Sequence, residues 1–404
     1  MGQYDFDCVV DRSGTDSLKW ERGGDEIPLW VADMDFMAPR EVREALIRRA
    51  SHGVFGYSVI PDRWREAYVS WWQRRHDLEL DPAWLVFATG VVPAISSAVR
   101  RLTAVGDKVV IQTPVYNIFF NSILNNGRHV LESPLIWRDG QYSMDFDDLE
   151  RCLADPETTM MILCNPHNPV GRIWSREELA RVGSLCRRHG VTVISDEIHC
   201  DLTAPGKAYV PFAGVSEDCR EISVTCVAPS KTFNLAGLQS AAVFAANSHL
   251  RERISRGLNT DEVAEPNAFA VEGAVAAYTW GAEWLDELRS YIQDSRDLVA
   301  EFARRHLPGI CPVDAEATYL IWLDCSGILD GGSSVPLTAF LRSQAGVRLS
   351  SGDSYGTGGR GFLRLNAACP RQILEEGLRR LERGLEMFRC REQELKRQRD
   401  QDLA

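Results

Sequence analysis

The sequence predicts an α/β fold: a large domain built on a mainly parallel sheet covered by helices, together with a smaller α+β domain. Short apolar runs, rich in β-branched residues and bounded by Pro, Gly or Asn, alternate with amphipathic stretches through the middle of the chain. The runs are apolar on both faces, which is typical of parallel strands that helices cover from both sides. The 404 residues are also more than one small core organises, so a second domain is expected.

Six apolar runs are expected to form the strands of the large sheet: residues 84–90, 108–114, 159–166, 191–197, 222–230 and 240–246. Between the third and the fourth run, the sequence predicts a helix with clear ends. Ser175 is a suitable N-cap, Glu178 stands three residues later as in a capping box, and Gly190 ends the amphipathic pattern.

The later part of the chain has a different pattern. Long helical patterns run from about Val263 to His306, and the strand-like segments 318–324 and 361–368 and a charged helical tail follow. We expect a smaller α+β domain here. The expected division is 1–48 as an N-terminal segment contributing to the small domain, 49–285 as the large α/β domain, and 286–404 as the small C-terminal α+β domain.

Composition and charge exclude several classes of function. Hydrophobic residues make up 45% of the chain, and the net charge of 45 − 57 = −12 argues against nucleic-acid binding. The acidic opening segment lacks the apolar core of a signal sequence, and no apolar run is long enough to span a bilayer. The 11 cysteines are scattered without a C-x-x-C pair, and the histidines lack metal-site spacing. We therefore expect a cytoplasmic protein with no metal site.

Two motifs suggest nucleotide binding, and neither has the context it needs. VTVISDE (191–197) ends a strand with two carboxylates, as a magnesium-binding NTPase motif does, but no G-x-x-x-x-G-K-[ST] loop precedes it. GTGGRG (356–361) matches G-x-G-x-x-G, yet it precedes a strand instead of following one. We interpret the second motif as a glycine loop.

Polar groups are expected to meet at one edge of the large sheet, because adjacent parallel strands end at the same rim. Asp196 ends one strand, Lys231 follows the next strand, and Asn168 follows the strand before. A helix is predicted to begin after the strand that ends near Gly90, and the free N–H groups of residues 90–92 would form an anion cradle. The rim therefore offers an amine, a carboxylate, an amide and a site for phosphate.

That combination matches pyridoxal 5′-phosphate. A lysine amine condenses with its aldehyde, and a carboxylate keeps its pyridine nitrogen protonated so that the ring withdraws electrons. An amide donor suits the phenolate oxygen, and the helix N-terminus suits the phosphate. Tyr116, at the end of another predicted strand, is placed to cover the ring face.

Five motifs together resemble the fold-type I pyridoxal-phosphate enzymes, the aminotransferase-like proteins, over nearly the whole chain: ATG (88–90), PVYN (114–117), NPHNPVGR (165–172), SDEIHCDL (195–202) and APSKTFNLAGLQ (228–239). PLWVADMDF (28–36) and FGYS (55–58) narrow the resemblance further. They are similar to segments of the MalY/PatB-type cystathionine β-lyases, or C–S lyases.

The resemblance implies roles for individual residues. Lys231 would bind the cofactor aldehyde, Asp196 the pyridine nitrogen, and Asn168 the phenolic oxygen, with Lys231, Tyr57 and Tyr116 as the catalytic residues. The remaining cofactor-binding residues would be His199, which stands where aminotransferases usually have a tyrosine, and Gly90, Val91, Val92, Ser230 and Tyr57 near the phosphate. The substrate would be bound by Arg364, which grips the α-carboxylate, and by Ala32 and Asn168. Tyr57 would reach the site of a neighbouring subunit, which implies a homodimer with shared sites.

Two positions depart from the aminotransferase pattern. Gln239 stands eight residues after the lysine, where aminotransferases usually have a phosphate-binding arginine, and Ala228 stands where a serine is frequent. Glutamine at the first position is familiar in the lyase subgroup, so it favours a C–S lyase over an aminotransferase.

The resulting hypothesis is α,β-elimination from a cysteine S-conjugate such as cystathionine, which gives a thiol, pyruvate and ammonia. The amine of Lys231 would remove the α-proton. The alternatives are an aminotransferase, a regulatory protein that retains pyridoxal phosphate, and a plain nucleotide-binding α/β protein.

Overall fold

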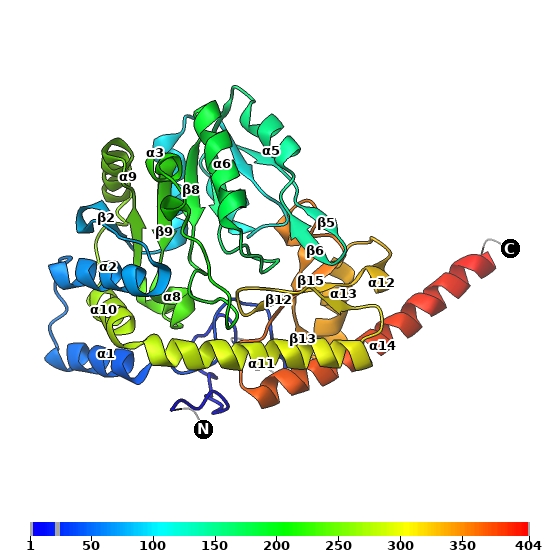
Figure 1. Ribbon diagram of the computed structural model, residues 1–404. Helices are drawn as coiled ribbons and strands as arrows, with labels where there is room; N and C mark the ends of the chain where they lie inside the picture. Colours follow the sequence, from blue (N-terminus) through cyan, green and yellow to red (C-terminus); the bar gives the residue numbers. More distant parts are fainter. Residues whose placement is uncertain (1–2, 21–24, 403–404) are drawn as a thin grey trace.

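The computed structural model describes residues 3–20 and 25–402. Its largest unit is a seven-stranded sheet with the order β2-β10-β9-β8-β7-β3-β4 (Figure 1). Its strands are β2 (Leu85–Ala88), β3 (Lys108–Ile111), β4 (His129–Glu132), β7 (Thr158–Cys164), β8 (Thr192–Asp196), β9 (Ser223–Val227) and β10 (Ala241–Phe244). Strand β10 pairs antiparallel with both of its neighbours, and the other pairs are parallel. The expected mainly parallel sheet is confirmed.

Each of the six predicted runs coincides with one strand of this sheet, with β7 beginning one residue before its run, and the structure adds β4, which no run predicted. Strand β4 is an edge strand of four residues, and none of them is fully buried. A half-exposed edge strand lacks the continuous apolar run that marks a buried parallel strand. The strand was therefore not recognisable from its sequence.

Helices cover the sheet on both faces. On one face α3 (Val91–Leu102), α4 (Ile118–Leu124) and α9 (Ser248–Thr260) bury their apolar sides against β3, β7 and β8. On the other face lie α5 (Phe146–Leu153), α6 (Arg176–His189) and α7 (Glu217–Ile222). Helix α6 begins at a complete capping box between Ser175 and Glu178 and ends at Gly190 in the left-handed conformation, as predicted.

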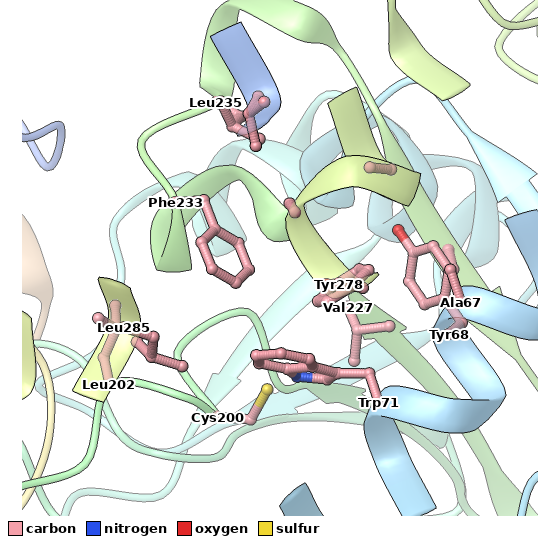
Figure 2. Close-up of a cluster of buried hydrophobic side chains, with 14 of the residues drawn as sticks. Ala67, Tyr68, Trp71, Cys200, Leu202, Val227, Phe233, Leu235, Tyr278 and Leu285 are labelled. Atoms are coloured by element: carbon pink, nitrogen blue, oxygen red, sulfur yellow. The ribbon is translucent and has the colours of Figure 1, made fainter. Parts of the chain in front are cut away.

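A third cluster of apolar residues lies beside the sheet. It is built from α1 (Arg40–His52), α2 (Asp62–His76) and α10 (Ala270–Trp280), and it includes several buried aromatic rings. Trp71 and Tyr278 pack there against Phe233, which follows Lys231 in the chain, and Tyr68 packs against Tyr278 (Figure 2). The cluster is thus the support on which the lysine segment rests.

The second unit is an antiparallel sheet with the order β11-β12-β15-β14. Its strands are β11 (Cys311–Pro312), β12 (Leu320–Asp324), β14 (Ser350–Ser351) and β15 (Phe362–Asn366). The long helices α11 (Ala282–His306) and α14 (Arg371–Asp402) pack along this unit with α13 (Val335–Phe340), and the end of α14 extends away from the body (Figure 1). A short parallel pair, β1 (Ile27–Pro28) with β13 (Val347–Arg348), joins the N-terminal segment to it.

The remaining elements are short. Strands β5 (Ile136–Arg138) and β6 (Gln141–Ser143) form a hairpin, and α8 (Pro229–Thr232) and α12 (Ser326–Leu329) are single turns. The helical pattern expected from about Val263 begins only at Ala270. Pro266 cannot donate a helical hydrogen bond, and the side chain of Asn267 accepts from the N–H of Ala270 instead. Even the longest described helices lack the sustained apolar stretch that crossing a membrane requires.

Candidate active site

A cavity of about 290 Å³ lies where β2, β3, β7, β8 and β9 end, at the carboxyl rim of the large sheet. Ligands bind at this rim in open α/β sheets. The predicted site residues that line it are Ala32, Gly90, Val91, Val92, Tyr116, Asn168, Asp196, His199, Ser230 and Lys231. The structure therefore brings together in one cavity residues that lie up to 199 positions apart in the sequence.

Lys231 lies on α8, one turn after β9, and not at the end of the strand itself. Two contacts hold this turn in place. The Thr232 hydroxyl donates to the buried Asp201 carboxylate at 3.0 Å, and Phe233 packs into the aromatic cluster (Figure 2). The Lys231 Nζ donates to the carbonyl of Ala32 at 2.7 Å. Burial lowers the pKa of this amine to about 8, so a minority of it is neutral near physiological pH, which is far more than for an exposed lysine.

Asp196 is the last residue of β8 and is buried. Its Oδ1 accepts from the N–H of Ile198 at 3.2 Å. Burial raises the pKa of this carboxyl to about 7, and the charge of Glu197 adds to the effect. A cationic ring nitrogen at this carboxylate would reverse the shift, because an opposite charge favours the ionised form.

Glu197, the second acid of the motif, has a structural place. It is fully buried and accepts hydrogen bonds from Ser195 Oγ at 2.7 Å, from the N–H of Phe212 at 2.9 Å and from the Tyr209 hydroxyl. Its carboxylate therefore ties the end of β8 to the segment around Phe212, and Asp196 alone lines the cavity.

Arg364 enters the site from the small sheet. It lies in β15, is 5% exposed, and donates from Nη1 to Asn168 Oδ1 at 3.2 Å and from Nη2 to the carbonyl of Trp30 at 3.0 Å. Its guanidinium also lies over the ring of Tyr355, 5.1 Å from the ring centroid. A planar guanidinium held in this way suits bidentate recognition of a carboxylate.

Two further side chains present neutral polar atoms to the cavity. Burial, with the charges of Lys231 and Arg364, lowers the pKa of His199 to about 3, so its imidazole is neutral. Its Nδ1 is buried and has no hydrogen-bond partner among the described residues. Burial raises the pKa of Tyr116 to about 12, which keeps its phenol protonated.

The anion cradle has the expected form. Helix α3 begins after Gly90 with no side-chain cap, so the N–H groups of its first turn are left for a ligand. A Cβ at Gly90 would lie 3.1 Å from Cδ of Pro93, so a side chain there would crowd the start of the helix. Ser230, Gln239 and Ser240 add polar side chains to the same cavity. The cradle, the unpartnered His199 nitrogen and the buried Asp196 carboxylate together fit pyridoxal phosphate.

Two predicted residues do not line the cavity of their own chain: Arg364, which contacts the lining residue Asn168, and Tyr57. Tyr57 is fully exposed in the loop between α1 and α2. It lines a neighbouring surface hollow together with Phe55 and Phe269, and Gln239 lines both that hollow and the cavity. Sharing of the site between subunits stays a prediction.

The sequence motifs did not predict several residues that belong to the site. Cys164, Ile198 and Ser240 also line the cavity, and the Ala32 carbonyl that receives Lys231 accepts from the Tyr319 hydroxyl at 2.9 Å. A strand-end argument could have found Ile198, which stands beside Asp196. The Tyr319 contact joins residues 287 positions apart and had no local signal.

Known proteins similar to this chain include one that contains pyridoxal 5′-phosphate. The family model described as aminotransferase class I and II matches residues 25–381. The chain is 46% identical to cystathionine beta-lyase PatB of Bacillus subtilis over 94% of this chain and 99% of that protein, and 36% identical to protein MalY of Escherichia coli over 93% and 97%. The crystal structure of cystalysin from Treponema denticola, which contains pyridoxal 5′-phosphate, matches with a TM-score of 0.92 and 32% identity over 95% of this chain and 99% of that one.

Proposed function

The chain belongs to the class I and II aminotransferase family, and from this membership we propose that it is a pyridoxal 5′-phosphate-dependent carbon–sulfur β-lyase. It cleaves cystathionine or related cysteine S-conjugates to a thiol, pyruvate and ammonia. Its relatives named as cystathionine β-lyases support the reaction. The observation that carries the proposal is the cavity in which the Lys231 amine, the Asp196 carboxylate and the N-terminus of α3 meet.

The residues of the chain would hold the cofactor at both of its ends. The first turn of α3, with Ser230, would bind the phosphate, and Asp196 would pair with the pyridine nitrogen. Asn168 and the neutral His199 would face the phenolic oxygen, and Tyr116 would cover the ring. When bound, pyridoxal phosphate withdraws electrons and so stabilises negative charge at the substrate Cα.

The other steps belong to the protein's own side chains. Arg364 binds the substrate carboxylate, exchanging its contact with the Trp30 carbonyl for a charge-assisted pair. The amine of Lys231, whose lowered pKa leaves it partly neutral, accepts the proton from Cα. The Cβ–S bond then breaks and the electron pair leaves with sulfur. With one water consumed, the products are the thiol, pyruvate and ammonium.

The test is direct. The purified protein, supplied with L-cystathionine, should release pyruvate and a thiol in equal amounts. Borohydride treatment of the native protein should fix a pyridoxyl group on Lys231, which peptide mass spectrometry would locate. Absence of that adduct would refute the assignment of Lys231, and absence of pyruvate with every cysteine S-conjugate tried would refute the lyase.

An aminotransferase is the second candidate, because the same cavity serves both reactions in principle and the family description names it. Transamination moves the α-proton to the cofactor and leaves the Cβ–S bond intact. A 2-oxo acid that retains its sulfur, formed without free thiol, would favour this candidate.

We also propose that the protein is a cytoplasmic homodimer in which Tyr57 contacts the phosphate in the neighbouring subunit. Val54, Phe55, Tyr57 and Val59 are exposed apolar residues of one loop, and a second copy would cover them. All 11 cysteines are free, which suits a reducing compartment. The division into residues 1–48, 49–285 and 286–404 is likewise a proposal, supported by the separate cores of the two sheets.

A further inference from the structure

Ala32 of the cavity wall belongs to a short segment without regular secondary structure, residues 29–36, which we call the strap. Side chains from the small sheet and from the turn after α8 hold its backbone. Asn366 of the small sheet donates to the carbonyls of Val31 and Asp33 at 2.5 and 2.6 Å. Asn234, three residues after Lys231, donates to the carbonyls of Met34 and Phe36 and accepts from the N–H of Met34. Groups on the strap therefore have fixed positions relative to the Lys231 amine.

Asp33 is the acidic residue that follows Ala32 on the strap, and Ala32 is the residue whose carbonyl receives Lys231. Its Oδ2 lies 3.0 Å from Arg12 Nη2. Its Oδ1 is buried and accepts no hydrogen bond from any described residue. The ion-pair partner of Oδ1 is Lys19, whose Nζ is 3.7 Å away.

The distance of 3.7 Å between Lys19 and Asp33 is explained by Asp35, two residues further along the chain. Its carboxylate accepts from Lys19 Nζ at 2.8 Å, from Arg12 at 2.7 Å and from the Trp20 indole N–H at 2.8 Å. The Lys19 amine is therefore bound mainly to Asp35. Among the described residues, the Oδ1 of Asp33 thus stays buried without a hydrogen-bond donor, on the segment that touches the Lys231 amine.

We propose that Asp33 is a positioning residue that stabilises positive charge on the Lys231 amine while that amine holds the substrate's α-proton. The inference rests on the proposed function, because only there does Lys231 carry a proton during the reaction. A charged amine in a buried cavity is costly unless a carboxylate lies nearby. Asp33 directly follows Ala32, whose carbonyl lies 2.7 Å from the Lys231 Nζ, and its negative charge favours the protonated amine, whereas Arg364 opposes it.

The remaining titratable groups around the amine do not replace Asp33. His199 is neutral because its pKa is lowered to about 3. Tyr319, which shares the Ala32 carbonyl, is protonated because burial raises its pKa. Asp196 would be paired with the cofactor ring nitrogen in the holoenzyme, so Asp33 would be the carboxylate left to balance the amine.

The test measures the Lys231 amine itself, in the full-length chain after removal of the cofactor. Competitive acetylation at graded pH, read for each lysine by peptide mass spectrometry, gives the labelling midpoint of Lys231. In Asp33→Asn the midpoint should fall by about half a pH unit, which is about threefold more labelling at neutral pH. In Asp33→Glu it should return toward the wild-type value. A folded Asp33→Asn protein with an unchanged Lys231 midpoint would overturn the proposal.

Two controls separate this effect from a general change in charge or folding. Lys207, an exposed lysine paired with Glu316 at 3.1 Å, should label identically in all proteins. Asp62→Asn removes a carboxylate that is 95% exposed and should move neither midpoint. If Asp33→Asn does not fold, Arg12→Gln gives the reverse test, because it removes a cation from Asp33. Its Lys231 midpoint should rise, and a midpoint that stays or falls would contradict the proposal.

The labelling test and the test of the proposed function can fail separately. The borohydride adduct on Lys231 is sought in the protein as purified, whereas the labelling midpoint is taken from the cofactor-free chain. A missing adduct with a shifted midpoint would refute the cofactor assignment and leave the Asp33–Lys231 interaction standing. An adduct with an unshifted midpoint would refute the role of Asp33 alone.

Discussion

The two walls of the cavity are built on different principles. At the rim of the large sheet, Asn168, Asp196 and Lys231 follow three adjacent strands, and each presents its side chain to the cavity. The strap instead contributes backbone: the carbonyls of Trp30 and Ala32 accept from Arg364 and Lys231. In the proposed function the rim would supply the groups that act on the cofactor, and the strap connects the rim to the small sheet. Changes at the rim should therefore act on the chemical step, and changes at the strap on binding and alignment.

The largest effect is expected at the rim, in Asp196→Asn. Loss of the charge that keeps the ring nitrogen protonated should lower kcat on the order of 100-fold to 1,000-fold. The cofactor-free protein should be at least as stable as wild type, because burial already disfavours this carboxylate and raises its pKa to about 7. Initial rates of pyruvate formation and the thermal midpoint of the cofactor-free chain check both parts. A variant that is inactive only because it is less stable would contradict this division of roles.

Arg364 contacts both walls, through Asn168 of the rim and the Trp30 carbonyl of the strap, and Arg364→Lys tests its role. Lysine keeps the charge and loses the planar fork, so the substrate carboxylate should be bound about 2 kcal/mol less well, roughly a 30-fold rise in KM. The kcat should change much less. Steady-state kinetics with cystathionine give both values, and a fall confined to kcat would place Arg364 in the chemical step instead.

The rim was readable from the sequence because it obeys a local rule. Asp196, Asn168 and Gly90 each end or follow an apolar run, and the ends of parallel strands meet. The strap was not readable in the same way. Ala32 and Arg364 were predicted from the family resemblance alone, and the contacts of Asn366 and Tyr319 with the strap span 333 or more and 287 positions respectively. No short-range pattern encodes which backbone carbonyl a distant side chain will reach.

The pH dependence of the reaction should report the protonation state of the Lys231 amine. The pKa of Lys231 is lowered to about 8, so the neutral, proton-accepting form increases as pH rises through 8. Below that value kcat should fall about tenfold per pH unit, because kcat reports the complex with substrate, in which the Lys231 amine would no longer hold the cofactor. A series of initial rates between pH 6 and 9.5, with circular dichroism to show that the fold persists, checks this. A flat profile across that range would mean that another group accepts the α-proton.

The strap itself is tested by Asn366→Ala. The change leaves the buried carbonyls of Val31 and Asp33 without their side-chain donor, which should cost about 1–3 kcal/mol of unfolding free energy. Because the strap then aligns Arg364 and Lys231 less well, kcat/KM should fall about tenfold. Urea denaturation and steady-state kinetics measure the two effects. Asn234→Ala, which releases the other end of the strap, is the matched variant and should act in the same direction.

The smallest effect is expected for Tyr57→Phe, which tests whether the cavity is complete in one chain. The hydroxyl is fully exposed here, so within a single chain its loss should change nothing. If a second subunit brings Tyr57 to the phosphate, the variant should lose cofactor a few-fold faster, since one hydrogen bond to a charged group is removed. Cofactor absorbance during dialysis measures the loss, and light scattering shows whether the dimer persists. Unchanged retention in an intact dimer would confine the phosphate site to the α3 N-terminus and the α8 turn, and the rim would then need no partner.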